Sequence, residues 1–265
     1  MPSYYDLAVI ADDVYNNQSA LTGQRIRRLQ GQSGPRTDRG FFAAPYECNG
    51  TLVIAFCGSN DSTDWLGTNF RLYSADTQLD PAKDFAVRMI MAHGASPQSV
   101  MLTGHSLGGA LAKYAALVLT RAGEPPAATV AFNAPNLRQG AYTHLAQGMA
   151  TTIASTNPVT GYFAHRTLRP RGDLPTASNQ AGRVMNVRLG KDKVSRIGVP
   201  LGHTHRLNTP ANPGGRLDVH WAHLMEAVLL ALGPPTAFGA RDVVTHLNGL
   251  GRPPDWTFWQ HFEIG

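Results

Sequence analysis

A serine set between two glycines is the feature of this sequence most able to do chemistry. The segment Gly104-His105-Ser106-Leu107-Gly108 follows an apolar run at 99–103 and opens a stretch rich in alanine and leucine. In that context G-x-S-x-G is typical of a sharp strand-to-helix turn that presents the serine at the carboxyl end of a strand. The helix N-terminus there favours a developing negative charge. The pattern predicts Ser106 as a nucleophile, and an ordinary serine at a glycine-rich helix start is the alternative.

The segments around this turn alternate between strand and helix patterns. Before the turn, the spacing predicts a helix at 4–17, strands at 40–48 and 51–57 joined by Asn49-Gly50, and a helix from Pro81, capped by Asp80, to Gly94. After it, we expect helices at 107–122 and 142–149 and strands at 127–132 and 183–189. This order predicts an α/β fold, with a mostly parallel central sheet flanked by helices, as a single domain over residues 1–265.

Three segments together resemble the class 3 (fungal-type) lipases of the α/β-hydrolase superfamily. They are the nucleophile segment 103–112, the strand end 131–135, and Ile54-Ala-Phe-Cys-Gly-Ser59 followed by Asp64-Trp65. The last is similar to the family's F-R-G-[ST] and D-W motif, with Cys57 replacing the arginine. The resemblance implies the α/β-hydrolase fold, a lid at 60–78, and Ser59 as one half of the oxyanion hole. The amide of Leu107, next to the nucleophile, is the expected second donor.

A serine nucleophile also needs a histidine base and a carboxylate that orients the base. In α/β hydrolases the acid follows the serine, and the histidine follows the acid. Asp192 comes just after the strand ending at 189, and 192–198 resembles the family's D-x-V-P-x-L stretch; Asp173 is the alternative acid. His223 opens the last helical stretch and resembles the family's histidine-plus-helix ending, and His220 is its rival.

Two histidine pairs raise the question of a metal. His203-x-His205 and His220-x-x-His223 could supply four nitrogen ligands. Neither pair lies in a recognised zinc signature, and a catalytic zinc would leave the serine turn unexplained. We therefore expect His203 and His205 to be structural or site-wall residues, and we expect neither a metal nor a cofactor.

Composition restricts the compartments and partners. With 43% hydrophobic and 15% charged residues the chain is globular, and no apolar run approaches the roughly 20 residues of a membrane span. Acidic residues at 6, 12 and 13 interrupt the region of a Sec signal, which predicts a cytoplasmic protein or one exported by a non-Sec route. The net charge is +5, and the basic residues are mostly scattered along the chain, so we expect no nucleic-acid partner. Cys48 and Cys57, far apart in the predicted hairpin, are expected to be free thiols.

These features predict a serine hydrolase of carboxylic esters, and the resemblance implies lipid esters, as in lipases and phospholipases. Apolar residues at 60–78 would meet a membrane surface or pack against the core. Two alternatives remain open: amide or thioester hydrolysis on the same fold, and a catalytically silent binding module. A basic chain with no Sec signal that resembles a lipase also suggests an exported effector with a cognate inhibitor protein, which is a hypothesis.

Overall fold

The computed structural model describes twelve stretches of the chain: 1–16, 18–19, 21–34, 41–58, 78–137, 182–190, 192, 194–196, 201–208, 228–229, 231–233 and 237–253. In chain order their elements are α1 (Tyr4–Asp13), β1 (Ile26–Arg28), β2 (Ala43–Cys48), β3 (Thr51–Phe56), α2 (Leu79–Ala92), the 3₁₀ turn η2 (Pro97–Ser99), β4 (Met101–His105), α3 (Leu107–Arg121), β5 (Ala128–Phe132), β6 (Val184–Leu189), the 3₁₀ turn η5 (Val194–Arg196), β7 (His203–Leu207) and α8 (Val243–Gly249).

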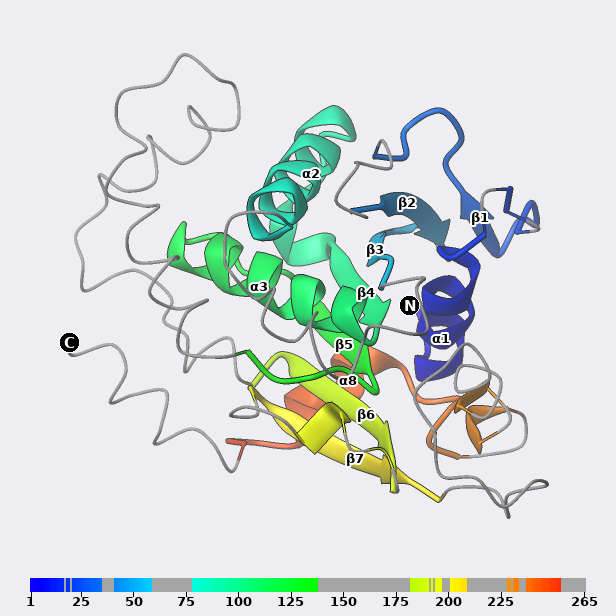
Figure 1. The fold of residues 1–265 in the computed structure, drawn as a ribbon, viewed down its shortest axis with the longest axis vertical. Coiled ribbons are helices and arrows are strands. Elements are labelled where there is room, and N and C mark those ends of the chain that lie inside the picture. The colour runs from blue at the N-terminus through cyan, green and yellow to red at the C-terminus, as the bar shows by residue number, and fades with distance from the viewer. Residues whose placement is uncertain are drawn as a thin grey trace.

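The described strands form one seven-stranded sheet whose spatial order, β1 to β7, is also their order in the chain (Figure 1). The strands β1, β2 and β3 are antiparallel, whereas β3 to β7 run parallel. The pairings Phe56 with Gly104 and His105 with Phe132 align the last residues of β3, β4 and β5. All parallel strands therefore end at one edge of the sheet, which is where ligands bind in open α/β folds.

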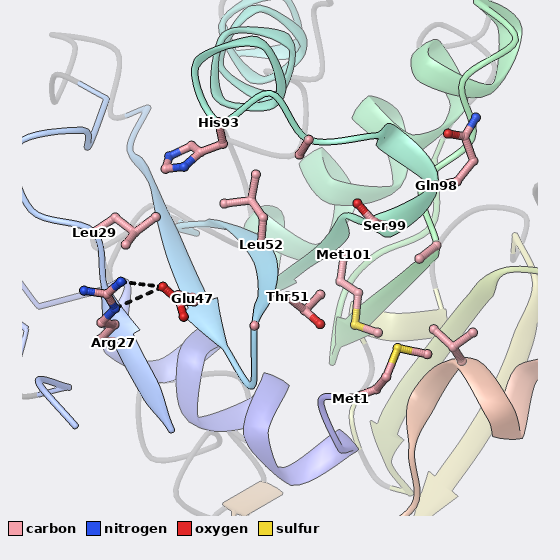
Figure 2. Close-up of a pocket in the computed structure, with 14 residues that line it drawn as sticks. Met1, Arg27, Leu29, Glu47, Thr51, Leu52, His93, Gln98, Ser99 and Met101 are labelled. Atoms are coloured by element: carbon pink, nitrogen blue, oxygen red, sulfur yellow. Dashed lines mark hydrogen bonds and ion pairs between the residues drawn. The ribbon is translucent and has the colours of Figure 1, made fainter. Parts of the chain in front are cut away.

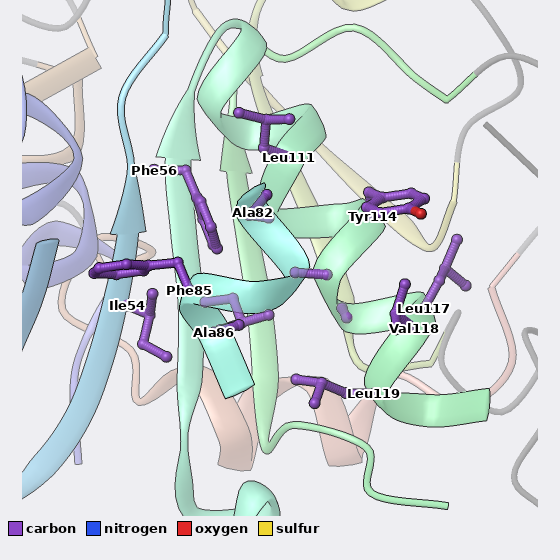
Figure 3. Packing of buried hydrophobic residues seen from close by; sticks show 14 of the residues in the cluster. Ile54, Phe56, Ala82, Phe85, Ala86, Leu111, Tyr114, Leu117, Val118 and Leu119 are labelled. Carbon is purple, nitrogen blue, oxygen red and sulfur yellow. The ribbon is translucent and has the colours of Figure 1, made fainter. Parts of the chain in front are cut away.

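Helices cover both faces of this sheet because its strands are apolar on both sides. Along β3, Ile54 and Phe56 pack towards α2 and α3, whereas Val53 and Ala55 pack towards α1 and α8. Figure 3 shows the first cluster, with Phe85 of α2 beside Ile54 and Phe56. Burying one such large apolar side chain contributes about 1.5–3 kcal/mol. Buried parallel strands with helices on both faces confirm the expected α/β fold with a mostly parallel central sheet.

Local sequence signals account for several element ends. Ser3 caps α1 in a reciprocal capping box with Asp6. Asn49 and Gly50 adopt φ values of 49° and 75°, the left-handed pair that a two-residue hairpin of type I′ requires. This hairpin places Cys48 opposite Thr51 as expected, and both cysteines are free and buried.

Three expectations about elements need correction. The second helix begins at Leu79 rather than at Pro81, and Asp80 lies inside its first turn, where the carboxylate accepts a hydrogen bond from Lys83 Nζ at 2.8 Å. Strand β4 begins at Met101, because Pro97–Ser99 forms a 3₁₀ turn. The strands β1 and β7 are additional elements. The helix expected at 142–149 lies outside the described residues, and no described helix is long and apolar enough to cross a membrane.

Candidate active site

Ser106 occupies a strained turn between β4 and α3. Its backbone has φ 55° and ψ −128°, a conformation that costs a non-glycine residue about 1–3 kcal/mol. Two sets of hydrogen bonds hold it there. Its amide donates to Phe132 O at 3.0 Å, and its carbonyl accepts from the amides of Gly109 and Ala110 at 3.1 and 3.3 Å. The side chain is therefore fixed at the carboxyl edge of the sheet, as the G-x-S-x-G pattern predicts.

The two glycines of the pattern are required by close packing. A Cβ on Gly104 would lie 2.5 Å from the carbonyl carbon of Gly108 and 2.7 Å from Phe56 O. A Cβ on Gly108 would lie only 2.0 Å from Phe56 O. Only glycine lets the start of α3 approach the end of β3 this closely.

This close approach places the start of α3, with the amide of Leu107, beside the end of β3. Leu107 is the first residue of α3, so its amide is one of the four that no preceding helical turn can satisfy. Ser59 lies outside the described residues. Its neighbour Gly58 is the last described residue of this segment and follows the end of β3. The arrangement can therefore stabilise an anion beside Ser106 through the helix N-terminus.

A tyrosine that the sequence patterns do not single out joins the residues just after β3 to the end of β4. The Tyr15 hydroxyl accepts the amide N–H of Gly58 at 3.1 Å, donates to His105 O at 3.3 Å, and lies 3.1 Å from His105 Nδ1. If Nδ1 carries the ring proton, this one hydroxyl accepts two hydrogen bonds and donates one. Burial raises the pKa of Tyr15, so the hydroxyl stays neutral and keeps its proton. Tyr15 thus ties the segment before Ser59 to the residue before Ser106.

Asp192 lies at the same edge of the sheet, just beyond the end of β6. Its side chain is 1% exposed, and its two carboxylate oxygens accept the amide N–H groups of Val194 and Ser195 at 3.0 and 3.1 Å. These bonds make Asp192 the cap of the 3₁₀ turn η5. Two amide donors fix the direction of this buried carboxylate, and a fixed carboxylate is what a catalytic histidine needs for its orientation.

Asn133 connects the ends of the two strands that lead to these residues. It follows β5 in the left-handed region, with φ 44°, where asparagine is tolerated better than most residues. Its side-chain Oδ1 accepts the amide of Leu189 at 2.9 Å, and its own amide donates to Val187 O at 2.9 Å. The strand of the acid is therefore locked to the strand beside the nucleophile.

The structure thus places three of the predicted site residues, Ser106, Leu107 and Asp192, at one edge of the sheet. The others, namely Ser59, His223, His220, Asp173 and all of the expected lid at 60–78 except its last residue, lie outside the described residues. Sequence patterns do not find Tyr15 or Asn133, because their roles depend on partners that are distant in the chain.

The histidines of β7 contact other parts of the protein. The His203 carbonyl accepts from Asn186 Nδ2 at 3.0 Å, and the His205 ring stacks on Phe238 with 3.5 Å between centroids. Burial, followed by repulsion from His246 and Arg241, lowers the pKa of His205. Among the described residues no group of three or more side chains could hold a metal ion, and the pair His220 and His223 lies outside them.

A surface groove of about 530 Å³ lies at the opposite edge of the sheet (Figure 2). Thr51 and Met101, which begin β3 and β4, line it together with Leu52, His93 and Ser99. Because Ser106 follows the carboxyl end of β4, this groove is not part of the candidate site.

Comparison with known proteins shows that the candidate nucleophile lies within a region that matches a known protein family. A family model for a Tle-like phospholipase domain, of the phospholipase-like group, matches residues 6–165. Extracellular phospholipase A1 of Serratia liquefaciens is 36% identical over 124 residues, a match that covers 43% of this chain and 38% of that protein. The chain thus spans less than two fifths of this curated relative. The family match includes Ser106 and ends before Asp192.

The solved structures that resemble this chain are more distant in sequence. A mutant form of MDLA from Penicillium cyclopium is 14% identical, with a TM-score of 0.46 over 79% of this chain and 80% of that one. Lip2 lipase from Yarrowia lipolytica is 12% identical, with a TM-score of 0.43 over 78% and 77%.

Proposed function

We propose, from the premise that this chain belongs to the Tle-like phospholipase family, that it hydrolyses the carboxylic esters of lipids. The observation that carries the proposal is the backbone of Ser106, held at φ 55° between a buried strand and a helix N-terminus. This strain serves to present a nucleophile beside the amides that stabilise an oxyanion. The family model that matches describes a Tle-like phospholipase domain and not a class 3 lipase. The finer assignment to the class 3 lipases is therefore part of the proposal.

The proposed mechanism is acyl transfer through Ser106. His223 takes the proton of the Ser106 hydroxyl as the oxygen attacks the acyl carbonyl, and the resulting oxyanion accepts hydrogen bonds from the amides of Leu107 and Ser59. The intermediate then releases the alcohol, which receives the proton from His223. Water, deprotonated by the same histidine, attacks the acyl-enzyme and frees the acid. Asp192 orients the base, a role supported by its burial at the edge that carries Ser106.

Phospholipid is the substrate class that we propose first. The family match is to a phospholipase domain, and the net charge of +5 would attract the chain to anionic lipid surfaces. We propose in addition that residues 60–78 contact this surface and that a cognate inhibitor protein binds the enzyme. Co-purification of a stoichiometric partner with the tagged chain from native extracts would support the inhibitor, and recovery of the chain alone would count against it.

A lipid-hydrolysis assay tests the proposed function. Phosphatidylcholine vesicles with different acyl chains at the two positions, with and without phosphatidylglycerol, are incubated with wild type and with Ser106→Ala. We expect wild type to release fatty acid, faster from the anionic vesicles and equally well with EDTA, and the variant to release none. Matched acylglycerol, ester and amide substrates extend the assay to the alternatives. Faster cleavage of the amide would favour the other acyl chemistry, and a folded protein without any hydrolysis would favour the binding module.

A further inference from the structure

A lysine is buried in the helix that begins beside Ser106. Lys113 lies about two turns into α3, with none of its surface exposed, in a helix whose other buried residues are mainly apolar. Its Nζ donates to Oδ1 of Asn136 at 3.2 Å and to Oδ1 of Asn186 at 3.0 Å. Burying an ammonium group is costly unless hydrogen bonds satisfy it, and these two amides supply such bonds.

The two asparagines extend this contact in different directions. Asn136 follows β5, and its Nδ2 donates to the carbonyl of Ser195 at 3.3 Å. Asn186 lies in β6, and its Nδ2 donates to the carbonyls of Leu201 and His203 at 2.8 and 3.0 Å. One arm therefore reaches the turn η5, and the other reaches the start of β7.

The arm through Asn136 ends at the candidate acid. Ser195 is held on both sides: its carbonyl accepts from Asn136, and its amide donates to the Asp192 carboxylate. The Ser195 hydroxyl also donates to the Asp192 carbonyl at 3.4 Å. A shift of Ser195 would therefore move one of the two amide donors that orient the carboxylate.

We propose that Asn136, anchored by the buried ammonium group of Lys113, is a positioning residue that holds the Asp192 turn in register with the nucleophile helix. The inference rests on the proposed function, because this register matters only if Asp192 orients the base of Ser106. The network ties the helix that starts at the nucleophile to the turn capped by the acid, through buried side chains of the described residues.

Asn186 provides a matched control. Both asparagines are buried, at 4% and 6% exposure, and both accept a hydrogen bond from Lys113. The isosteric changes Asn136→Asp and Asn186→Asp keep an acceptor for the ammonium group, and each removes an amide donor. Only the first of these donors reaches the acid turn. Asn136→Ala and Asn186→Ala form a second pair that adds no charge, in case one aspartate variant fails to fold.

The experiment measures kcat and KM for a soluble p-nitrophenyl ester, and the rate of fluorophosphonate labelling of Ser106, below the melting temperature of every variant. We expect Asn136→Asp to lower kcat and the labelling rate by about tenfold to hundredfold with little change in KM. Asn186→Asp loses two donated hydrogen bonds where Asn136→Asp loses one, so it should lower the melting temperature at least as much as Asn136→Asp does. Its kcat should stay within about threefold of wild type, well short of the loss from a misplaced catalytic group.

The outcomes separate this inference from the proposed function. If esterolysis depends on Ser106 but both asparagine variants lose kcat equally, or neither loses it, the positioning role of Asn136 is overturned and the proposed function stands. If Ser106→Ala hydrolyses the ester as fast as wild type, the proposed function is overturned, and this inference with it.

Discussion

Replacing Gly108 by alanine tests whether the contact between β3 and α3 sets the geometry of the active site. The added Cβ would lie 2.0 Å from Phe56 O and 2.9 Å from the Cys57 carbonyl carbon. Ordinary contacts of a Cβ begin near 3.4 Å. Because both neighbours are backbone atoms, no side-chain rotation can relieve the overlap, and the start of α3 must retreat from β3 by more than about 1 Å.

The magnitude follows from two opposing effects. Overpacking costs about 1–3 kcal/mol, and alanine in place of glycine in a helix returns up to about 1 kcal/mol. At roughly 2–4 °C per kcal/mol for a domain near this size, the melting temperature should fall by a few degrees. The loss of activity should be larger. A displacement of about 1 Å between Ser106 and the oxyanion donors is expected to lower kcat/KM by about a hundredfold.

Thermal melting and ester hydrolysis measure the two effects, with Gly249→Ala as the control. Gly249 ends α8, has no atom within 4 Å of an added Cβ and does not adopt a positive φ, so alanine should be neutral or slightly stabilising there. A Gly108→Ala protein with wild-type melting temperature and kcat/KM would refute the reasoning, because the two elements could then separate without consequence for the site.

Three further predictions concern neighbouring groups. Tyr15→Phe leaves the Gly58 amide without its hydroxyl acceptor, so it should lower the free energy of unfolding by about 1–3 kcal/mol and also lower kcat. Tyr46→Phe, which removes a hydrogen bond to Asp13, is the control and should lower stability without lowering kcat. Equal kcat values in the two variants would contradict this prediction. Asp192→Asn should lower kcat by about 10⁴-fold if this carboxylate orients the base, and a loss under tenfold would favour another acid. His205 has a lowered pKa in the fold, so stability should be retained above the unfolded pKa of about 6.5 and fall as the pH drops below it. His205→Phe, which keeps the ring stack, should flatten this dependence in melts between pH 7 and 5, and an unchanged slope would contradict the assignment.

The features that the sequence predicts correctly are those with a local physical cause. The turn at Ser106 needs glycines on both sides, and the hairpin needs Asn49 and Gly50 at positive φ, so short patterns suffice. The parallel strands are apolar runs separated by helical spacing, and this order restricts their connections. The position of Asp192 follows because the strand before it ends at the same edge as β4.

The features that the sequence does not predict depend on distant partners. Strand β7 is short and alternates exposed and buried residues with two histidines, so no apolar run marks it. Tyr15 follows the end of α1, and its partners Gly58 and His105 are 43 and 90 residues away in the chain. Lys113 occupies a predictable helix, but a lysine side chain alone does not indicate burial against two asparagines.

Fluorophosphonate labelling, mapped by mass spectrometry, tests the central claim most directly. The purified protein and its Ser106→Ala variant are treated side by side, with and without detergent. The account predicts a single adduct, located on Ser106 and absent from the variant. An adduct on another residue, or none under either condition with a folded protein, would contradict the claim that this strained turn presents an activated nucleophile.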